Sequence, residues 1–308
     1  MRIISNDTNF IMDDDCCVAI GKFDGIHIGH LEILRKLSDA SKDGLRTVIF
    51  TFDPSPASFF SGKVISELMT REEKRKIFED LGVDYLYEYP LNEETASVEA
   101  ETFIRRFLHE QLKARVIISG DDISFGKEGK GDERLLRSLS DELGYEVITI
   151  NKVCIMGKTV SSTLVRNEVA SGRMEDVTML LGHPYRLMEK IVAGARLGRT
   201  IGMPTINMIT CEGKLLPPNG VYYSRVWVNG NCYNALTNIG VKPTVKSDGE
   251  VVLESYLYDF EGDLYGMNAV VELLSFKRKE TKFSGVEELA QQLLVDREDG
   301  KHYFSKKQ

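Results

Sequence analysis

Residues 16–40, CCVAIGKFDGIHIGHLEILRKLSDA, decide the fold of the first half of the chain. The apolar run 16–20 predicts a buried strand, and residues 31–40 carry apolar side chains at helical spacing. The connection between them holds two histidines, His27 and His30, on either side of Gly29 where the helix begins. Backbone N–H groups at a helix start favour anions, and glycine lets the backbone approach a phosphate closely. We therefore predict a phosphate-binding turn between a strand and a helix.

Strands and helices continue to alternate up to about residue 150. Further strands are predicted at 47–52, 85–87, 116–118 and 146–150, and helices at 98–112 and 134–143. This alternation is typical of a doubly wound α/β fold with a parallel sheet, which binds ligands beyond the carboxyl ends of its strands. Two more helices are expected at 161–170 and 175–181, ended by Gly172 and Gly182.

The pattern changes after Tyr185. Segments with alternating apolar residues, at 221–228, 251–258 and 269–274, predict antiparallel strands, and Asn229-Gly230 predicts a hairpin turn. A last helix is expected at 286–295. We therefore predict two domains: a doubly wound α/β domain over residues 1–185, and a small antiparallel β-barrel with a C-terminal helix over residues 186–308.

Composition limits the function classes. The 308 residues carry a net charge of -8, which disfavours nucleic acid and anionic membranes as partners. The start of the chain lacks the basic run and apolar core of a secretory signal, and no apolar stretch reaches the ~20 residues that span a bilayer. The five cysteines form no CxxC pair, which argues against a disulfide framework and a zinc site. We expect a cytoplasmic protein with reduced thiols.

The histidine loop, residues 21–30, is the first candidate site. Its imidazoles can donate hydrogen bonds to the charge that builds on a transferring phosphate. The alternative is a tight turn in which His27 and His30 only cap the helix. The preceding strand, the following helix and the glycines at positions 21, 25 and 29 favour the catalytic interpretation.

The second candidate site lies at residues 194–207, GARLGRTIGMPTIN. Its glycines, spaced by four, predict a loop that can wrap phosphates, although it is neither a Walker A nor a Rossmann motif. Thr205 and Asn207 alternate, so both side chains face one side of an extended segment. Their oxygens suit Mg²⁺ that is shared with substrate phosphates. Turn-capping roles are the alternative for these two residues.

The histidine loop resembles the HxGH signature of the nucleotidyltransferase superfamily, which transfers AMP from ATP and releases pyrophosphate. Three further segments are TFDP at 51–54, GDDISFG at 120–126 and SSTLVR at 161–166. Together they resemble the bacterial bifunctional riboflavin kinase/FAD synthetase family. The resemblance extends from Cys17 to Asp296, and the motifs follow the family's order.

In the first half, the resemblance implies that His27 and His30 contact the ATP phosphates as catalytic residues. Asp53 and Asp122 would belong to the flavin or nucleotide pocket. The ATP- or phosphate-binding set implied for this half is Gly21, Phe23, Asp24, Gly29, Ser162, Thr163 and Arg166. The alternatives are a plain N-cap for Ser162, a solvated side chain for Arg166 and turn chemistry for Asp53.

In the second half, GRxxGxPTxN at 198–207 resembles the riboflavin kinase signature, and NIGVKPT at 238–244 resembles its next motif. The resemblance implies that Thr205 and Asn207 hold Mg²⁺ and that Glu254 is the general base. It also implies that Arg278, in RKETKF at 278–283, contacts the flavin. The implied phosphate-binding residues are Gly198, Arg199 and Gly202. The alternative for Glu254 is a surface acid on an edge strand.

Some positions depart from the family pattern. They are Lys22 for Asn, Ser55 for His, Ile123 for Phe, Leu164 for Arg, Ala195 for Asp and Lys242 for Arg. Four of these fall in the adenylyltransferase motifs, where they bear on rate and nucleotide preference.

The implied function is conversion of riboflavin to FMN and then to FAD, with ATP and Mg²⁺ as the other reactants. The alternatives are a chain that retains only the kinase, an adenylyltransferase for another metabolite, and a flavin- or nucleotide-responsive regulator without catalysis. The joint presence of His27, His30, Thr205, Asn207 and Glu254 disfavours the regulator, because a binding module needs no base.

Overall fold

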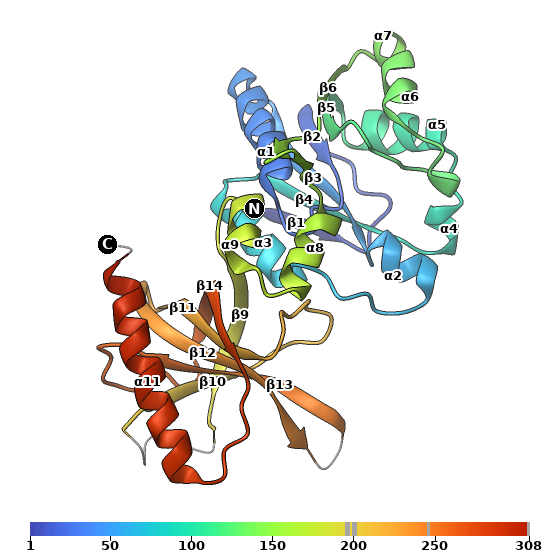
Figure 1. The fold of residues 1–308 in the computed structure, drawn as a ribbon. Coiled ribbons are helices and arrows are strands. Elements are labelled where there is room, and N and C mark those ends of the chain that lie inside the picture. Colours follow the sequence, from blue (N-terminus) through green and yellow to red (C-terminus); the bar gives the residue numbers. More distant parts are fainter. Residues whose placement is uncertain (195–197, 199–201, 245–246, 307–308) are drawn as a thin grey trace. The chain divides into compact units, whose positions relative to one another are not determined.

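The computed structural model describes residues 1–194, 198, 202–244 and 247–306 (Figure 1). The chain divides into two compact units, residues 1–162 and 163–308. The domain boundary expected near residue 185 stays a prediction. In the division into compact units, the two helices between residues 162 and 185 belong to the second unit.

The backbone of residues 1–162 is described throughout and contains a six-stranded parallel sheet of order β1-β4-β3-β2-β5-β6. The strands are β1 (Arg2–Ser5), β2 (Cys16–Ile20), β3 (Arg46–Asp53), β4 (Tyr85–Pro90), β5 (Ala114–Gly120) and β6 (Glu146–Ile150). The chain order reverses at β2, which pairs with β3 on one side and β5 on the other. The carboxyl ends of β2 and β5 therefore form the crevice where sheets of this kind bind ligands.

Both faces of β2 are covered, which explains its unbroken apolar sequence. The Cys16 thiol donates to the carbonyl oxygen of Leu112 at 3.0 Å, and the Cys17 thiol donates to that of Leu37 at 3.6 Å. Adjacent residues of a strand point to opposite faces, so these contacts lie on two sides of the sheet. Helix α1 (Ile28–Ala40) buries Ile33, Leu34 and Leu37, which confirms the predicted apolar stripe.

Two predicted helices differ in detail from the structure. The helix expected at 98–112 is α5 (Ala100–Thr102) followed by a π-helix (Phe103–Gln111), where the Leu112 N–H bonds to the Phe107 carbonyl oxygen at 3.0 Å. The helix expected at 134–143 is split into α6 (Glu133–Ser138) and α7 (Ser140–Leu143). The hydroxyls of Ser138 and Ser140 bond to main-chain carbonyls in this stretch, a pattern that bends helices. Not predicted were β1, α2 (Pro56–Ser61), α3 (Arg71–Asp80) and α4 (Glu93–Ala96).

The described part of the second unit contains a closed antiparallel barrel of order β10-β13-β12-β11-β14-β9, as the sequence predicts. The strands are β9 (Tyr185–Val192), β10 (Thr205–Ile209), β11 (Gly220–Val228), β12 (Asn231–Thr244), β13 (Ser247–Leu257) and β14 (Asn268–Lys279). Asn229 and Gly230 have φ of 49° and 78° and form the hairpin turn between β11 and β12. Helices α8 (Ser162–Ala170) and α9 (Met174–Leu181) precede the barrel, and α9 packs on β9 and β14.

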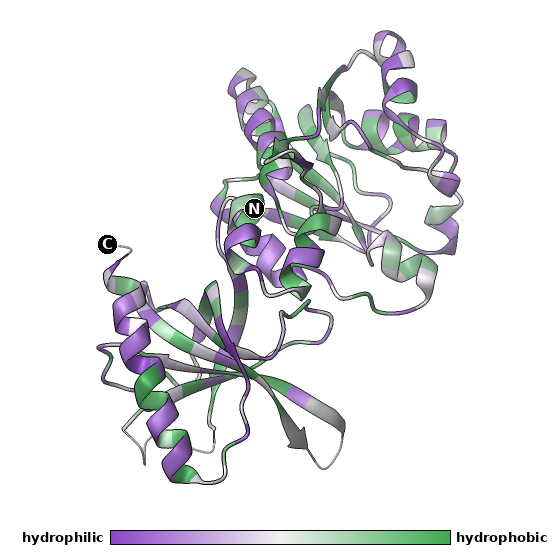
Figure 2. Cartoon of the chain, in the orientation of Figure 1, coloured by the Kyte–Doolittle hydropathy of each residue, from purple (hydrophilic) through white to green (hydrophobic). Residues whose placement is uncertain are grey.

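Helix α11 (Val286–Ser305) is longer than the predicted 286–295. Figure 2 shows hydrophobic and hydrophilic bands along it, and it packs on β12. Tertiary packing stabilises the second half of α11. Phe304 is buried there, and a Cβ at Gly300 would overlap the Tyr258 hydroxyl. Among the helices that the structure describes, none is long and apolar enough to cross a membrane.

Candidate active sites

The histidine loop leaves the carboxyl end of β2 and turns sharply. The N–H of Gly21 bonds to the Phe50 carbonyl oxygen at 3.1 Å, which continues the pairing with β3. Phe23, Gly25 and Ile26 all have positive φ, at 48°, 88° and 42°. The two non-glycine residues adopt this disfavoured conformation where their side chains are fully buried, so packing holds the turn in place. Phe23 can therefore meet a nucleotide only through its backbone.

The two imidazoles stack on each other at the start of α1. His27 is the N-cap, its Nδ1 accepts from the His30 N–H at 3.4 Å, and the ring centroids lie 3.8 Å apart at 14°. A Cβ on Gly29 would lie 3.2 Å from the His27 ring, closer than ordinary van der Waals contact. The glycine between the histidines thus allows the stack, and the Phe23 ring lies 5.3 Å from His30.

Burial keeps both imidazoles neutral at pH 7. It lowers the pKa of His27 to about 4. It also lowers the pKa of His30 well below the usual value, and the neighbouring His27 and Lys74 lower it further. Within the described part of the chain, His30 Nδ1 is buried without a hydrogen-bond partner. At neutral pH this pair offers hydrogen bonds to an anion and no full positive charge.

Asp24 ties the histidine loop to two other segments. Its Oδ1 accepts from the Leu68 N–H at 2.8 Å, and its main-chain oxygen accepts from the Ser162 hydroxyl at 2.8 Å. The structure thereby brings Ser162, at the start of the 161–166 motif, to the histidine loop, and the implied role of this motif in phosphate binding stays a prediction. Thr163 and Arg166 follow in α8, within the second unit.

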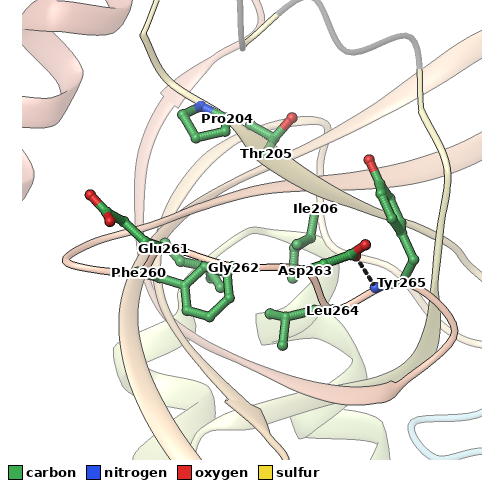
Figure 3. A pocket seen from close by; sticks show the side chains of 10 residues that line it. Pro204, Thr205, Ile206, Phe260, Glu261, Gly262, Asp263, Leu264 and Tyr265 are labelled. Atoms are coloured by element: carbon green, nitrogen blue, oxygen red, sulfur yellow. Dashed lines mark hydrogen bonds between the residues drawn. The ribbon is translucent and has the colours of Figure 1, made fainter.

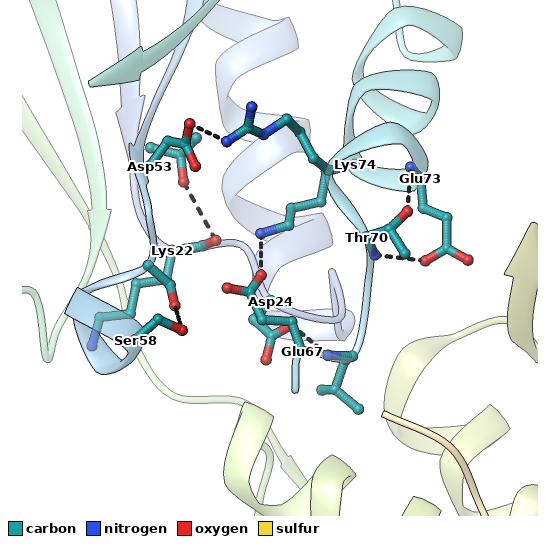
Figure 4. A network of polar contacts seen from close by, with 12 residues as sticks. Lys22, Asp24, Asp53, Ser58, Glu67, Thr70, Glu73 and Lys74 are labelled. Carbon is teal, nitrogen blue, oxygen red and sulfur yellow. Dashed lines mark hydrogen bonds and ion pairs between the residues drawn. The ribbon is translucent and has the colours of Figure 1, made fainter. Parts of the chain in front are cut away.

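A lysine that sequence reasoning missed lies beside this loop. Lys74 comes from α3, whose start is fixed by the reciprocal bonds between Thr70 and Glu73 (Figure 4). Its Nζ lies 2.7 Å from Glu67 Oε2, and only 14% of the Lys74 side chain is exposed. Helix α3 was not predicted, so no sequence signal placed this charge near His30.

The two predicted flavin-pocket acids follow β3 and β5, the two strands that flank β2 in the sheet. Asp53, labelled in Figure 4, ends β3 and forms an ion pair with Arg71 of α3. Asp122 follows β5 and lies 3.2 Å from Lys152 Nζ, with 69% of its side chain exposed. Both belong to the crevice edge of the parallel sheet, and the negative charge of Asp122 acts on His27.

The second candidate site is a row of residues across five strands of the barrel. Glu254 on β13 lies opposite Asn207 on β10 and opposite Asn238 on β12. The row continues through Val221 on β11, which pairs with both Asn238 and Arg278 of β14. Directly opposed residues share one face of a sheet, so the predicted Asn207, Glu254 and Arg278 face the same side of the barrel wall.

A cavity of about 310 Å³ lies on that face, and we call it the helix cavity because α11 covers it. The barrel contributes Thr205, Asn238, Glu254, Tyr256 and Arg278 among others, and α11 contributes Leu289, Leu293 and Asp296. Glu254 is half-buried, which disfavours the solvated surface acid that the sequence left open.

A second cavity of about 430 Å³, the loop cavity, also has Thr205 in its wall (Figure 3). Figure 3 shows Phe260 and Tyr265 on the loop between β13 and β14, opposite Pro204 and Thr205. Sequence reasoning missed this loop, FEGDLYG at 260–266. The sequence signal for this loop is two glycines and two aromatic residues between two predicted strands. Gly262 and Gly266 indeed have positive φ, of 149° and 80°.

The glycine segment is described in part. The Met203 N–H bonds to the Gly198 carbonyl oxygen at 2.8 Å, and Gly202 has φ of 72°. A Cβ on Gly194 would overlap the Asn207 amide, so glycine is required for Asn207 to occupy its buried position. Arg199, predicted to bind phosphate, lies outside the described residues, as does Ala195.

Both halves of the chain match known protein families. The sequence pattern of FAD synthetases matches residues 11–164, and that of riboflavin kinases matches residues 181–304. The chain is 31% identical, with a TM-score of 0.85, to a crystal structure described as a macrolide-efflux protein from Streptococcus pneumoniae. That match covers 97% of this chain and 98% of the other, and it shows that the two share one fold.

Two relatives extend over nearly the whole chain. The bifunctional riboflavin kinase/FMN adenylyltransferase of Listeria monocytogenes is 34% identical over 292 residues, and that of Bacillus subtilis is 33% identical over 295 residues. Each match covers 94% of this chain and 92% of the relative. These findings confirm the resemblance drawn from the motifs. The chain belongs to the family of bifunctional riboflavin kinases/FMN adenylyltransferases.

Proposed function

We propose that this protein phosphorylates riboflavin to FMN with one ATP and then transfers AMP from a second ATP to FMN, giving FAD and pyrophosphate. The observation that carries the proposal is the pairing of Glu254 with Asn207 and Asn238, on a cavity that shares Thr205 with a second cavity. A site for phosphoryl transfer needs two adjoining spaces, one for each substrate, and a base at their junction.

In the kinase site, we place the flavin in the helix cavity and ATP in the loop cavity. The aromatic rings of Phe260 and Tyr265 offer stacking surfaces for a base. Glu254 takes the proton of the ribityl 5′-hydroxyl as that oxygen bonds to the γ-phosphorus, and the bond to the β-phosphate oxygen breaks to release ADP. Thr205 lines both cavities, which supports a position for the transferring phosphate between them.

Thr205 and Asn207 would hold Mg²⁺ in this site. Their donors are a hydroxyl and an amide oxygen, and Asn207 lies across from the carboxylate of Glu254, a set of oxygens that suits this cation. When bound, Mg²⁺ neutralises phosphate charge. Gly198, Arg199 and Gly202 would bind the phosphates, and Arg278 the flavin.

In the adenylyltransferase site, a phosphate oxygen of FMN attacks the α-phosphorus of ATP, and pyrophosphate leaves. The neutral His27 and His30 donate hydrogen bonds to the charge on the phosphates, beside the N–H groups of the α1 start. Lys74 adds positive charge that the imidazoles lack. The ATP phosphates would meet the backbone of Gly21, Phe23 and Gly29. They would also meet the side-chain donors of Ser162, Thr163 and Arg166. The flavin side of the site would be lined by Asp53 and Asp122.

We further propose that the protein works in the cytoplasm, where ATP is available and thiols stay reduced. None of the five cysteines, all of which lie in the described part of the chain, forms a disulfide bond, and Cys154, Cys211 and Cys232 are exposed. With a net charge of -8 we expect no nucleic-acid partner.

The test is a time course of the pure protein with riboflavin and Mg·ATP, in which FMN and FAD are resolved chromatographically. FMN should rise first and FAD should follow. FMN that accumulates without FAD would show a kinase alone, and the absence of both products would contradict the proposal.

A further inference from the structure

We propose that Asp296 of α11 is a positioning residue of the kinase site, which fixes the guanidinium of Arg278 toward the riboflavin. The inference rests on the proposed kinase function. Asp296 was not among the residues that the sequence singled out, because a single acid in the charged stretch VDREDGK resembles the solvated face of a helix.

The contact between the two side chains is bidentate. Arg278 Nη2 lies 2.6 Å from Asp296 Oδ2, and Arg278 Nε lies 3.0 Å and 3.1 Å from Oδ2 and Oδ1. Only 1% of the Asp296 side chain and 21% of the Arg278 side chain are exposed. Two parallel N–H···O bonds fix the plane of a guanidinium, which a single contact would leave free to rotate.

Arg278 has donors beyond those that bind Asp296, and the residue lines the helix cavity. Nη1 donates one hydrogen bond to the Lys279 carbonyl oxygen at 3.0 Å. A guanidinium has five N–H groups, and within the described residues the bonds of Arg278 engage three of them, which leaves one N–H on each Nη nitrogen. Arg278 lines the helix cavity together with Glu254, so these groups are placed to meet carbonyl oxygens of a flavin ring.

Asp296 is itself held from several directions. Gln292 Nε2 donates to Oδ1 at 3.0 Å, and Lys277 Nζ lies 3.6 Å from the same oxygen. Leu289, Leu293 and Asp296 recur at helical spacing and all line the helix cavity. One face of α11 therefore supplies both the apolar wall of the cavity and the carboxylate that orients Arg278.

Stability alone gives a weak reason for this carboxylate. Replacement of a buried ion pair by apolar residues of similar size is often neutral or stabilising. An apolar residue at position 296 would also continue the wall formed by Leu289 and Leu293. A requirement of the kinase for an oriented Arg278 guanidinium explains why Asp296, a fully buried acid, occupies this position.

The first test compares Asp296→Asn with Asp299→Asn in the full-length protein. Asp299 lies one turn further along α11 and pairs with Lys277, so its substitution is a matched control. Loss of a charge-assisted hydrogen bond should raise the KM for riboflavin about 10- to 100-fold in Asp296→Asn, with a smaller change in kcat and in the KM for ATP. Asp299→Asn should stay within about twofold, and adenylylation of supplied FMN should be retained in both.

A double-mutant cycle separates positioning from a merely structural role. In the Arg278→Met background, Asp296→Asn should raise the KM for riboflavin no further, because Asp296 acts through Arg278. An Asp296→Asn protein with a KM within twofold of the wild type, or effects that multiply in the double variant, would overturn the proposal.

If Asp296→Asn does not fold, Asp296→Glu carries the test. It keeps the charge but displaces the guanidinium, so the KM for riboflavin should rise several-fold and an unchanged value would refute positioning. If the wild type forms no FMN, the proposed function fails, and riboflavin binding followed by flavin fluorescence then tests the same comparisons without catalysis.

Discussion

The hydroxyl of Ser162 donates a hydrogen bond of 2.8 Å to the main-chain oxygen of Asp24, although the two residues are 138 positions apart. The bond joins the histidine loop to the start of α8, and the carboxylate of Asp24 meanwhile holds the N–H of Leu68. Three segments that are distant in the sequence are thus joined at the histidine loop.

Ser162→Ala should weaken adenylylation of supplied FMN about fivefold and leave phosphorylation of riboflavin unchanged. Loss of one hydrogen bond typically destabilises a local arrangement by about 1 kcal/mol. Ser140→Ala is the control, because its hydroxyl makes a comparable bond to the Arg137 carbonyl oxygen on an exposed helix. Equal losses in the two variants would show that the bond has no specific role.

Replacement of His27 and His30 by Ala should reduce FAD formation from FMN by about 10²–10³-fold, because transition-state charge loses its donors. Formation of FMN from riboflavin should persist, since it depends on the barrel. Product analysis with each flavin supplied separately gives both rates. Undiminished FAD synthesis would remove the histidine loop from the mechanism.

The buried imidazoles should make the first unit less stable in acid. Their folded-state pKa values are lowered, to about 4 for His27, while the unfolded chain titrates near 6.5. Between these values the unfolded state binds more protons, so stability falls as pH falls from about 6.5 toward 4.

A variant with His27→Gln and His30→Gln should lack this part of the pH dependence. Its stability relative to the wild type should therefore increase from pH 7 to pH 5, measured by denaturant unfolding followed by circular dichroism. A stability difference that is constant across this range would show that the imidazoles are not buried in solution.

Glu254→Gln should reduce riboflavin phosphorylation by about 10²–10⁴-fold, the usual contribution of a general base. The amide has nearly the same shape, so adenylylation of supplied FMN should stay intact. Glu250→Gln is the matched control, because Glu250 is an exposed residue on the same strand. Phosphorylation within a few-fold of the wild type would exclude Glu254 as the base.

Gly194→Ala should reduce kinase activity by up to about 10²-fold, because the new Cβ overlaps the Asn207 amide and displaces a proposed Mg²⁺ ligand. Gly285→Ala is the control, since a Cβ there meets no atom within 4 Å. Steady-state kinetics with varied Mg·ATP should show the effect. If both variants behaved alike, the close contact of Gly194 with Asn207 would be unimportant.

Much of the architecture follows from local sequence. The strand Cys16–Ile20 and the stripe Ile33, Leu34 and Leu37 were predicted correctly because a fully buried strand and a half-buried helix have distinct apolar periods. Left-handed Gly172 and Gly182 end their helices, as glycine at such positions predicts. The family motifs also indicated both halves of the function.

Tertiary structure alone decided which side chains meet. No local pattern shows that Asn207, Glu254, Asn238 and Arg278 form one row, since strand register depends on barrel closure across the whole unit. Nor could the sequence distinguish Lys74 and Asp296 from the solvated charges around them, because burial depends on what packs against a helix. The sequence determined the elements and the chemistry they carry, and long-range packing determined the partners.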